Sequence, residues 1–96
     1  MTSKQRAKLR SIASNIEPSF QIGKGDISDN QIAGLDGALS ARELLKINVL
    51  RSCGLDAKEA AAELAEKLKA EVVAVTGNKI VLYRFSSKDN IKHIEF

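Results

Sequence analysis

Apolar residues recur along this chain with two different spacings. In three segments they return every three or four positions, which is the period of a helix with one buried face. These helical segments begin at Lys4, Ser28 and Asp56. Other segments alternate apolar with polar residues, as strands with one buried face do. The predicted strands are 19–23, 43–51, 71–76 and 79–85.

Residues that favour the ends of helices and strands stand at the borders of these segments. Pro18 ends the first helix, because proline lacks a backbone N–H and disfavours helical geometry in the residue before it. Ser28 and Gln31 have the spacing of a capping box, in which two residues satisfy each other's free backbone N–H groups. Gly77 and Asn78 form a two-residue link that is typical of a hairpin between the last two strands.

The resulting order is one helix followed by βαβαββ. This order predicts an α/β fold with a four-stranded mixed sheet and helices packed in layers. The crossover connections place the two later helices on one face of the sheet, so the first helix or a ligand must cover the other face. We expect this domain to span residues 1–85, followed by a polar tail, 86–96, whose structure the pattern does not predict.

The composition agrees with a single small domain and indicates the compartment in which the protein works. The 96 residues suit one domain, and 44% apolar with 28% charged residues is a globular balance. The longest apolar run has four residues, which is too short for a membrane span or a secretory signal. Cys53 is the only cysteine, so an internal disulfide is excluded. We therefore expect a cytoplasmic protein.

Positive charge is concentrated near the start of the chain. The first ten residues carry four cations and no acid, whereas the net charge of the whole chain is only +3. These four cations are Lys4, Arg6, Lys8 and Arg10. Such asymmetry orients a phosphate-binding protein on a polyanion, although an ordinary solvated surface explains it equally well. Further cations that would extend a basic surface are Lys46, Lys79 and Arg84.

A glycine-rich loop is the second candidate for anion contact. Gly23, Lys24, Gly25 and Asp26 separate the first predicted strand from the second helix. The loop therefore faces the free N–H groups at the helix start, which attract anions. Its glycines let the backbone approach a ligand closely, as in the GXXG loop of KH domains. Short glycine turns between a strand and a helix are common, so an ordinary turn is the alternative.

The inventory of reactive and aromatic side chains limits the possible functions. His93 and Cys53 are the only residues of their types, so neither a nucleophile–base pair nor a metal cluster can be assembled from them. We therefore expect no enzyme, no cofactor, no metal and no small-molecule substrate. Aromatic residues make up only 4% of the chain, too few for a broad base-stacking surface. Nucleic-acid binding would then depend on phosphates and shape.

Four stretches of the sequence form, in this order, a combination that is more specific than any of them alone. They are TSKQRAKLRSIASNIEP at 2–18, FQIGKGDI at 20–27, ALSARELLKINVL at 38–50 and GNKIVLYR at 77–84. With these stretches the chain resembles the YhbY-type CRM domain family, the stand-alone bacterial form of this domain. The resemblance implies a helix followed by βαβαββ, similar to the C-terminal domain of bacterial translation initiation factor three.

The resemblance also implies RNA binding without catalysis. Bacterial members associate with precursors of the large ribosomal subunit, so the implied role is an assembly factor that contacts ribosomal RNA; we expect it to act as a monomer. The GXXG-type loop of the family matches 23–25, whereas Asp26 replaces the fourth glycine and adds negative charge beside the proposed phosphate site. The residues expected to bind RNA are Lys4, Arg6, Lys8, Arg10, Gly23, Lys24, Gly25, Arg42, Lys46 and Arg84.

A different class of function stays open at this point. The chain is alternatively a protein-interaction module that docks on a ribosomal protein or GTPase through an open sheet face. RNA binding predicts an affinity that falls steeply as salt rises. Protein docking predicts an association that survives nuclease treatment and high salt.

Overall fold

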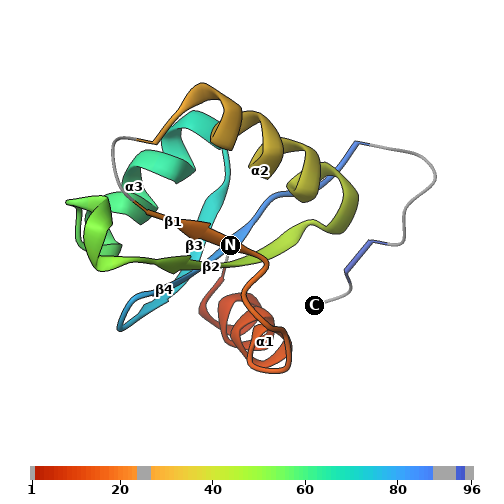
Figure 1. The fold of residues 1–96 in the computed structure, drawn as a ribbon. Coiled ribbons are helices and arrows are strands. Elements are labelled where there is room, and N and C mark those ends of the chain that lie inside the picture. Colours follow the sequence, from red (N-terminus) through yellow and green to blue (C-terminus); the bar gives the residue numbers. More distant parts are fainter. Residues whose placement is uncertain (1, 24–26, 88–92, 95–96) are drawn as a thin grey trace.

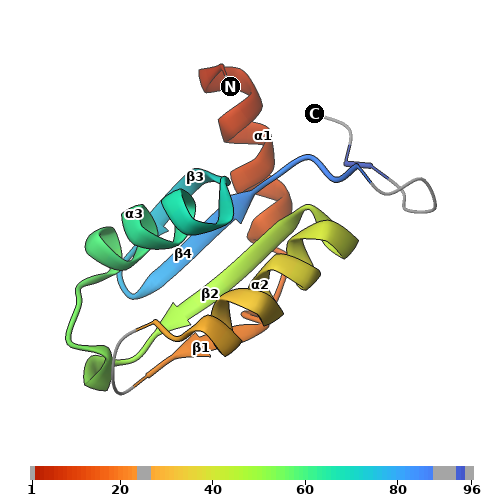
Figure 2. The same cartoon turned by 90° about the horizontal axis from the view of Figure 1, so that it is seen from above.

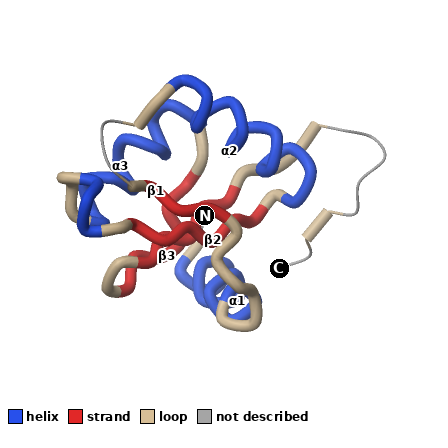
Figure 3. Tube along the Cα trace, in the orientation of Figure 1, coloured by secondary structure: helices blue, strands red, loops and turns tan. Residues whose placement is uncertain are grey.

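The computed structural model describes residues 2–23, 27–87 and 93–94. Within these ranges the chain forms three α-helices, a short 3-10 helix and four strands (Figure 1, Figure 3). Their bounds are α1 (Ser3–Ala13), β1 (Phe20–Ile22), α2 (Asp29–Arg42), β2 (Leu44–Val49), η1 (Arg51–Cys53), α3 (Ala57–Leu68), β3 (Glu71–Thr76) and β4 (Lys79–Tyr83). The predicted order of a helix followed by βαβαββ is confirmed.

The four strands form one mixed sheet in the order β1-β2-β4-β3. β1 runs parallel to β2, whereas β4 runs antiparallel to both of its neighbours, β2 and β3. The predicted two-residue hairpin link is confirmed, since Thr76 pairs with Lys79. α2 and α3 cover one face of the sheet, and α1 lies against the other (Figure 1, Figure 2). The predicted layers are confirmed, and the first helix covers the sheet face opposite α2 and α3.

The larger hydrophobic core lies between the sheet and the helices α2 and α3. Leu45 and Ile47 alternate along β2 and point to this side, where they belong to one cluster with Leu39 of α2 and Leu64 of α3. All four side chains are almost fully buried. Burial of a side chain of this size contributes roughly 1.5–3 kcal/mol. This core therefore supplies the larger share of the hydrophobic stabilisation.

A smaller core holds α1 on the opposite face. Leu9 and Ala13 stand four residues apart on α1, so both face the sheet. They are buried in a cluster with Leu44 of β2 and with Val81 and Tyr83 of β4. β2 is thus buried on both sides at its start, because neighbouring residues contribute to different cores.

One row of side chains across the α1 face stays outside this smaller core. Asn48 of β2 pairs with Gln21 of β1 and with Lys79 of β4, which in turn pairs with Thr76 of β3. Asn48 follows Leu44 by four residues, so it points toward the α1 side, and its paired residues point the same way. Gln21, Lys79 and Thr76 are exposed. We call these four residues the polar row; it contains a cation and no acid.

The starts of the helices differ in part from the prediction. α1 begins with a capping box that sequence analysis did not identify, in which Gln5 N donates to Thr2 Oγ1 and Thr2 N donates to Gln5 Oε1. At α2, Gln31 N donates to Ser28 Oγ as predicted. The second half of that box is not formed among the described residues; instead, Gln31 Nε2 donates to the carbonyl oxygen of Gln21. This side chain therefore ties α2 to β1.

A buried carboxylate anchors the chain that follows β4. Glu43 ends α2 in a left-handed conformation (φ 67°), and its side chain is fully buried. The carboxylate accepts hydrogen bonds from the backbone N–H groups of Ser86 (2.7 Å) and Ile94 (2.9 Å), and His93 Nδ1 lies 2.8 Å from Oε2. β4 ends at Tyr83, two residues before the predicted strand end. Ser86, His93 and Ile94 are held against the domain, in a tail whose structure the polar pattern did not predict.

Candidate nucleic-acid interface

α1 carries cations on the sides that face away from the sheet. Because Leu9 is buried against the sheet, residues on the other sides of the helix point to solvent. Arg6 reaches back to the sheet edge, where its Nη1 donates to the carbonyl oxygen of Val72 at 3.0 Å. The first turn of α1 contains no acid to offset these charges. The other exposed cations of the helix are Lys4, Lys8 and Arg10.

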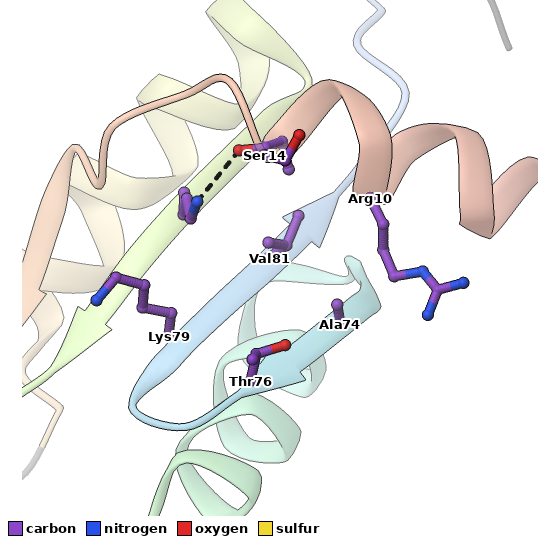
Figure 4. A pocket seen from close by; sticks show the side chains of 8 residues that line it. Arg10, Ser14, Ala74, Thr76, Lys79 and Val81 are labelled. Atoms are coloured by element: carbon purple, nitrogen blue, oxygen red, sulfur yellow. Dashed lines mark hydrogen bonds between the residues drawn. The ribbon is translucent and has the colours of Figure 1, made fainter.

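The C-terminal end of α1 and the sheet enclose a pocket of about 230 Å³ (Figure 4). Its apolar lining comes from Ala13 of α1, Ala74 of β3 and Val81 of β4. Polar and charged side chains complete the lining. These are Arg10, Ser14, Lys46, Thr76 and Lys79. The pocket therefore combines an apolar floor with a cationic rim.

Lys46 links the end of α1 to this pocket. Its Nζ donates to the carbonyl oxygen of Ala13 at 3.2 Å. The last carbonyl groups of a helix carry partial negative charge, which a nearby cation stabilises. An ammonium group has three donors, so Lys46 has two more for a ligand while it fixes the helix end.

The other two cations of the pocket are available to a ligand. The side chains of Arg10 and Lys79 make no hydrogen bond or ion pair with any other residue that the structure describes. In Figure 4 they lie on opposite sides of Ala74, Thr76 and Val81. Among the residues that the structure describes, no acidic one lines the pocket. The site can therefore attract negative charge on two sides.

The predicted phosphate loop lies only partly within the structure. Lys24, Gly25 and Asp26 fall outside the described residues, so their role stays a prediction. Gly23 directly follows β1, and Ser28 begins α2. The start of α2, with its free N–H groups, therefore adjoins the loop on its C-terminal side.

The polar row connects the pocket with the end of β1. Lys79 belongs to both the row and the pocket, and Gln21 stands two residues before Gly23. Neither the row nor the pocket lining contains an acidic side chain. The described residues of the row and of the pocket lining thus place no negative charge along this path from the cationic helix to Gly23, where the glycine loop begins.

Two predicted RNA-binding arginines lie elsewhere. Arg42 ends α2, where its Nη1 donates to Ser19 Oγ at 3.2 Å, close to the start of β1. Arg84 lies on the α2 and α3 side of the sheet, and its guanidinium donates four hydrogen bonds to described residues. They run to Asp36 Oδ1 (2.6 Å), the Leu68 carbonyl oxygen (2.8 Å), the Asp36 carbonyl oxygen (2.9 Å) and Ser40 Oγ (2.9 Å). The structure therefore does not bring Arg84 together with the cations of α1.

Strand parity separates two cations that sequence analysis treated alike. Lys79 and Arg84 are five positions apart, and an odd separation in an extended chain places side chains on opposite faces. Lys79 accordingly lines the pocket beneath α1, whereas Arg84 contacts α2 and α3. Ser14 and Thr76 were not identified from the sequence, since only the docking of α1 on the sheet brings them together.

The described residues offer few side chains for a metal site or a catalytic site. They contain no group of three or more histidine, cysteine, aspartate or glutamate side chains that could hold a metal ion. Cys53 is buried, and His93 is paired with Glu43. Among the helices described, none has the length and apolar character needed to cross a bilayer.

A cationic helix docked on a mixed sheet, with a cation-rimmed pocket beneath its end, defines a small α/β domain with a surface suited to polyanions. The model of the CRS1/YhbY (CRM) domain matches residues 1–84. The chain belongs to the CRM domain family.

Similar proteins support this membership. "Probable RNA-binding protein YqeI" of Bacillus subtilis is 44% identical over 95 residues, which are 99% of this chain and 97% of that protein. "Probable RNA-binding protein MJ0652" of Methanocaldococcus jannaschii is 37% identical over 86 residues, 88% of this chain and 63% of that protein. The solution structure of the hypothetical protein SAV1595 of Staphylococcus aureus has a TM-score of 0.74 and 42% identity, with 94% of each chain covered.

Proposed function

We propose that this protein binds RNA without catalysing a reaction, and that it acts as an assembly factor on ribosomal RNA of large-subunit precursors. The observation that carries the proposal is a set of cations, running from α1 into the pocket, whose side chains have few partners among the described residues; the described lining of the pocket contains no acid. Membership of the CRM family and the names of two relatives support an RNA target.

Phosphate contacts supply the affinity in this proposal. Each cation that neutralises a phosphate releases a condensed counterion, which makes binding strongly dependent on salt. The described cations best placed for this are Lys4, Lys8, Arg10, Lys46 and Lys79. Arg6 adds charge from the sheet edge, whereas Arg42, at the end of α2, lies apart from this surface. Since few aromatic side chains are present, shape and phosphate spacing dominate over base stacking.

The glycine loop is the second phosphate contact of the proposal. Its first residue, Gly23, lies at the end of β1, next to the polar row. We propose that Lys24 and the backbone of Gly25 contact the next stretch of the same RNA strand. The carboxylate of Asp26 lowers the affinity of this loop for phosphate relative to a fourth glycine, because it adds negative charge there.

Docking on a protein through an open sheet face has less support. α1 occupies the apolar part of that face, where Leu44, Val81 and Tyr83 are buried against it. Apart from the small floor of the pocket, the part of this face that the described residues leave uncovered is the polar row. A stable protein interface usually has an apolar centre, which this part of the surface does not offer.

A charge-matched pair of variants tests the RNA-binding surface. One variant replaces Lys4, Lys8 and Arg10 with glutamine, and the other replaces three exposed lysines on the α3 side, Lys58, Lys67 and Lys69. Both lose three positive charges, so their net charges are equal. Affinity for a structured fragment of large-subunit ribosomal RNA is measured at several salt concentrations. We expect at least about a tenfold loss, and a salt slope smaller by roughly two to three units, for the α1 variant only.

Equal losses in both variants would show that only net charge matters, and an unchanged α1 variant would refute the proposed surface. Sedimentation of cell extract on a density gradient tests the finer claim. Association with particles that precede the mature large subunit supports an assembly role. Migration with mature subunits alone, or with neither, contradicts it.

A further inference from the structure

The pocket beneath the end of α1 has a lining that contact with phosphate alone does not require. Phosphate oxygens need donors, yet Ala13, Ala74 and Val81 make the centre of this pocket apolar. The cations Arg10 and Lys79 stand on either side of that centre (Figure 4). The lining therefore suits a ligand with a flat, largely apolar body and a negative charge on each side.

A nucleotide within an RNA strand has this constitution. Its base is a planar ring, and a phosphate precedes and follows its ribose. We propose that the pocket takes one unstacked RNA nucleotide, with the base against Ala74 and Val81 and the flanking phosphates near Arg10 and Lys79. This assignment rests on the proposed RNA-binding function and names the part of the RNA that the site recognises.

The size of the pocket agrees with a single base. Its volume is about 230 Å³, below the roughly 300–1,000 Å³ of sites that hold drug-sized ligands. On this proposal the nucleotide comes from a loop, a bulge or a strand end, because the edges of a base within a duplex are already paired. RNA-binding proteins commonly read such unpaired nucleotides, whose edges are accessible.

The polar groups of the pocket can bond the edge of a base. Lys46 uses one donor on Ala13 and has two others. The Ser14 hydroxyl donates to the carbonyl oxygen of Ser11 at 2.6 Å, so its oxygen can still accept a hydrogen bond. Thr76 contributes a second hydroxyl. Donors and acceptors are therefore both present, as the mixed edge of a base requires.

A neighbouring residue supplies an acceptor without a partner. Asn48 Oδ1 is buried and has no hydrogen-bond partner among the described residues. Asn48 pairs with Lys79 and so lies beside the pocket on the same face. A buried polar atom without a partner costs about 1–3 kcal/mol.

The test uses two RNA hairpins that differ by one bulged uridine. The variant Ala74→Leu fills the floor of the pocket and leaves every charge in place. The control, Ala62→Leu, adds the same side chain at an exposed position on α3. For the unmodified protein and the control, we expect tighter binding to the bulged hairpin than to the paired one. Ala74→Leu should remove this preference, with about a tenfold loss for the bulged RNA and little change for the paired RNA.

The outcomes separate this inference from the proposed function. If the unmodified protein binds both hairpins equally and Ala74→Leu changes neither affinity, RNA binding stands and the nucleotide pocket is refuted. If no RNA binds, the proposed function fails, and the inference fails with it. If Ala74→Leu weakens both hairpins equally, the pocket contacts the backbone only, which also overturns the base assignment.

A second measurement needs no variant and so does not depend on correct folding of Ala74→Leu. The methyl resonances of Ala74 and Val81 are followed by NMR during titration with uridine monophosphate and, separately, with inorganic phosphate. We expect both methyl signals to shift with the nucleotide because of the ring current of the base. Equal shifts with phosphate, or none with the nucleotide, would refute base binding in the pocket.

Discussion

The two faces of the sheet use cationic side chains in opposite ways. On the α2 and α3 face, the guanidinium of Arg84 is held by Asp36, Ser40 and the carbonyl oxygen of Leu68. On the α1 face, Lys79 makes no such contact with described residues and lines an open pocket. Both cations come from the same short stretch of chain. The partners of a cation, and not its presence, thus indicate whether it is available to a ligand.

The faces also differ in how firmly their helices are held. Among the described residues, the cluster under α2 and α3 contains fifteen buried side chains, whereas the cluster under α1 contains six. Elements with fewer buried contacts open locally at lower free energy. The helix proposed to meet RNA is therefore held by the smaller of the two cores.

The largest expected effect comes from truncating one leucine in each core. Leu64→Ala should cost about 2–5 kcal/mol of global stability, because it leaves a cavity in the larger core. Leu9→Ala should mainly free α1, so that amide exchange in α1 accelerates more than in α3. It should also weaken RNA binding although it removes no charge. Urea unfolding measures the stability, and hydrogen exchange measures the local opening of each helix. If Leu9→Ala accelerates amide exchange equally in all three helices, the two cores do not stabilise their helices separately.

The next effect concerns the carboxylate that holds the chain after β4. Burial raises the pKa of Glu43, but the hydrogen bonds from Ser86, His93 and Ile94 together lower it by more than burial raises it. The pKa of Glu43 therefore lies below the ordinary value of 4.5. A carboxyl whose pKa is lower in the folded state stabilises that state above its unfolded pKa. This contribution is lost as the pH falls through the folded pKa.

Glu43→Gln should therefore cost about 2–3 kcal/mol at pH 7, since the amide leaves buried N–H donors without full partners. The free energy of unfolding of the variant should also fall less between neutral and acidic pH than that of the unmodified protein. Urea unfolding at pH 7 and pH 3 measures both quantities. Glu66→Gln, at an exposed position of α3, is the control. An identical pH dependence in Glu43→Gln and the unmodified protein would contradict the assigned role of this carboxylate.

Glu43 also shows why part of this structure could not be predicted from the sequence. The element order follows from local spacing, and parity alone would have placed Lys79 and Arg84 on different faces. Burial of Glu43 depends on Ser86 and Ile94, which lie 43 and 51 positions away. The pocket likewise exists only because α1 docks across β3 and β4. Local patterns carry no information about either arrangement.

A smaller effect distinguishes the two cations directly. Arg84→Met should cost about 1–2 kcal/mol, because the carbonyl oxygen of Leu68 and the hydroxyl of Ser40 lose a donor in a partly buried site. Its RNA affinity should change little. Lys79→Met should leave stability nearly unchanged and weaken RNA binding. Thermal unfolding and RNA titration of both variants measure these effects: Arg84→Met should lower stability only, and Lys79→Met should lower RNA affinity only. If Arg84→Met weakens RNA binding more than Lys79→Met does, RNA binds the α2 and α3 face and not the α1 face.

The smallest expected change in stability is at Lys46, which combines both roles. Lys46→Met removes the cation at the end of α1 and should cost about 0.3–1 kcal/mol, the usual size of a charge effect at a helix end. If Lys46 also contacts a phosphate, the salt slope of RNA binding should fall by roughly one unit. Lys46→Arg keeps the charge and should preserve that slope. A lower affinity of Lys46→Met with an unchanged slope would assign Lys46 to the helix end alone, and the RNA contacts of the pocket would then belong to Arg10 and Lys79.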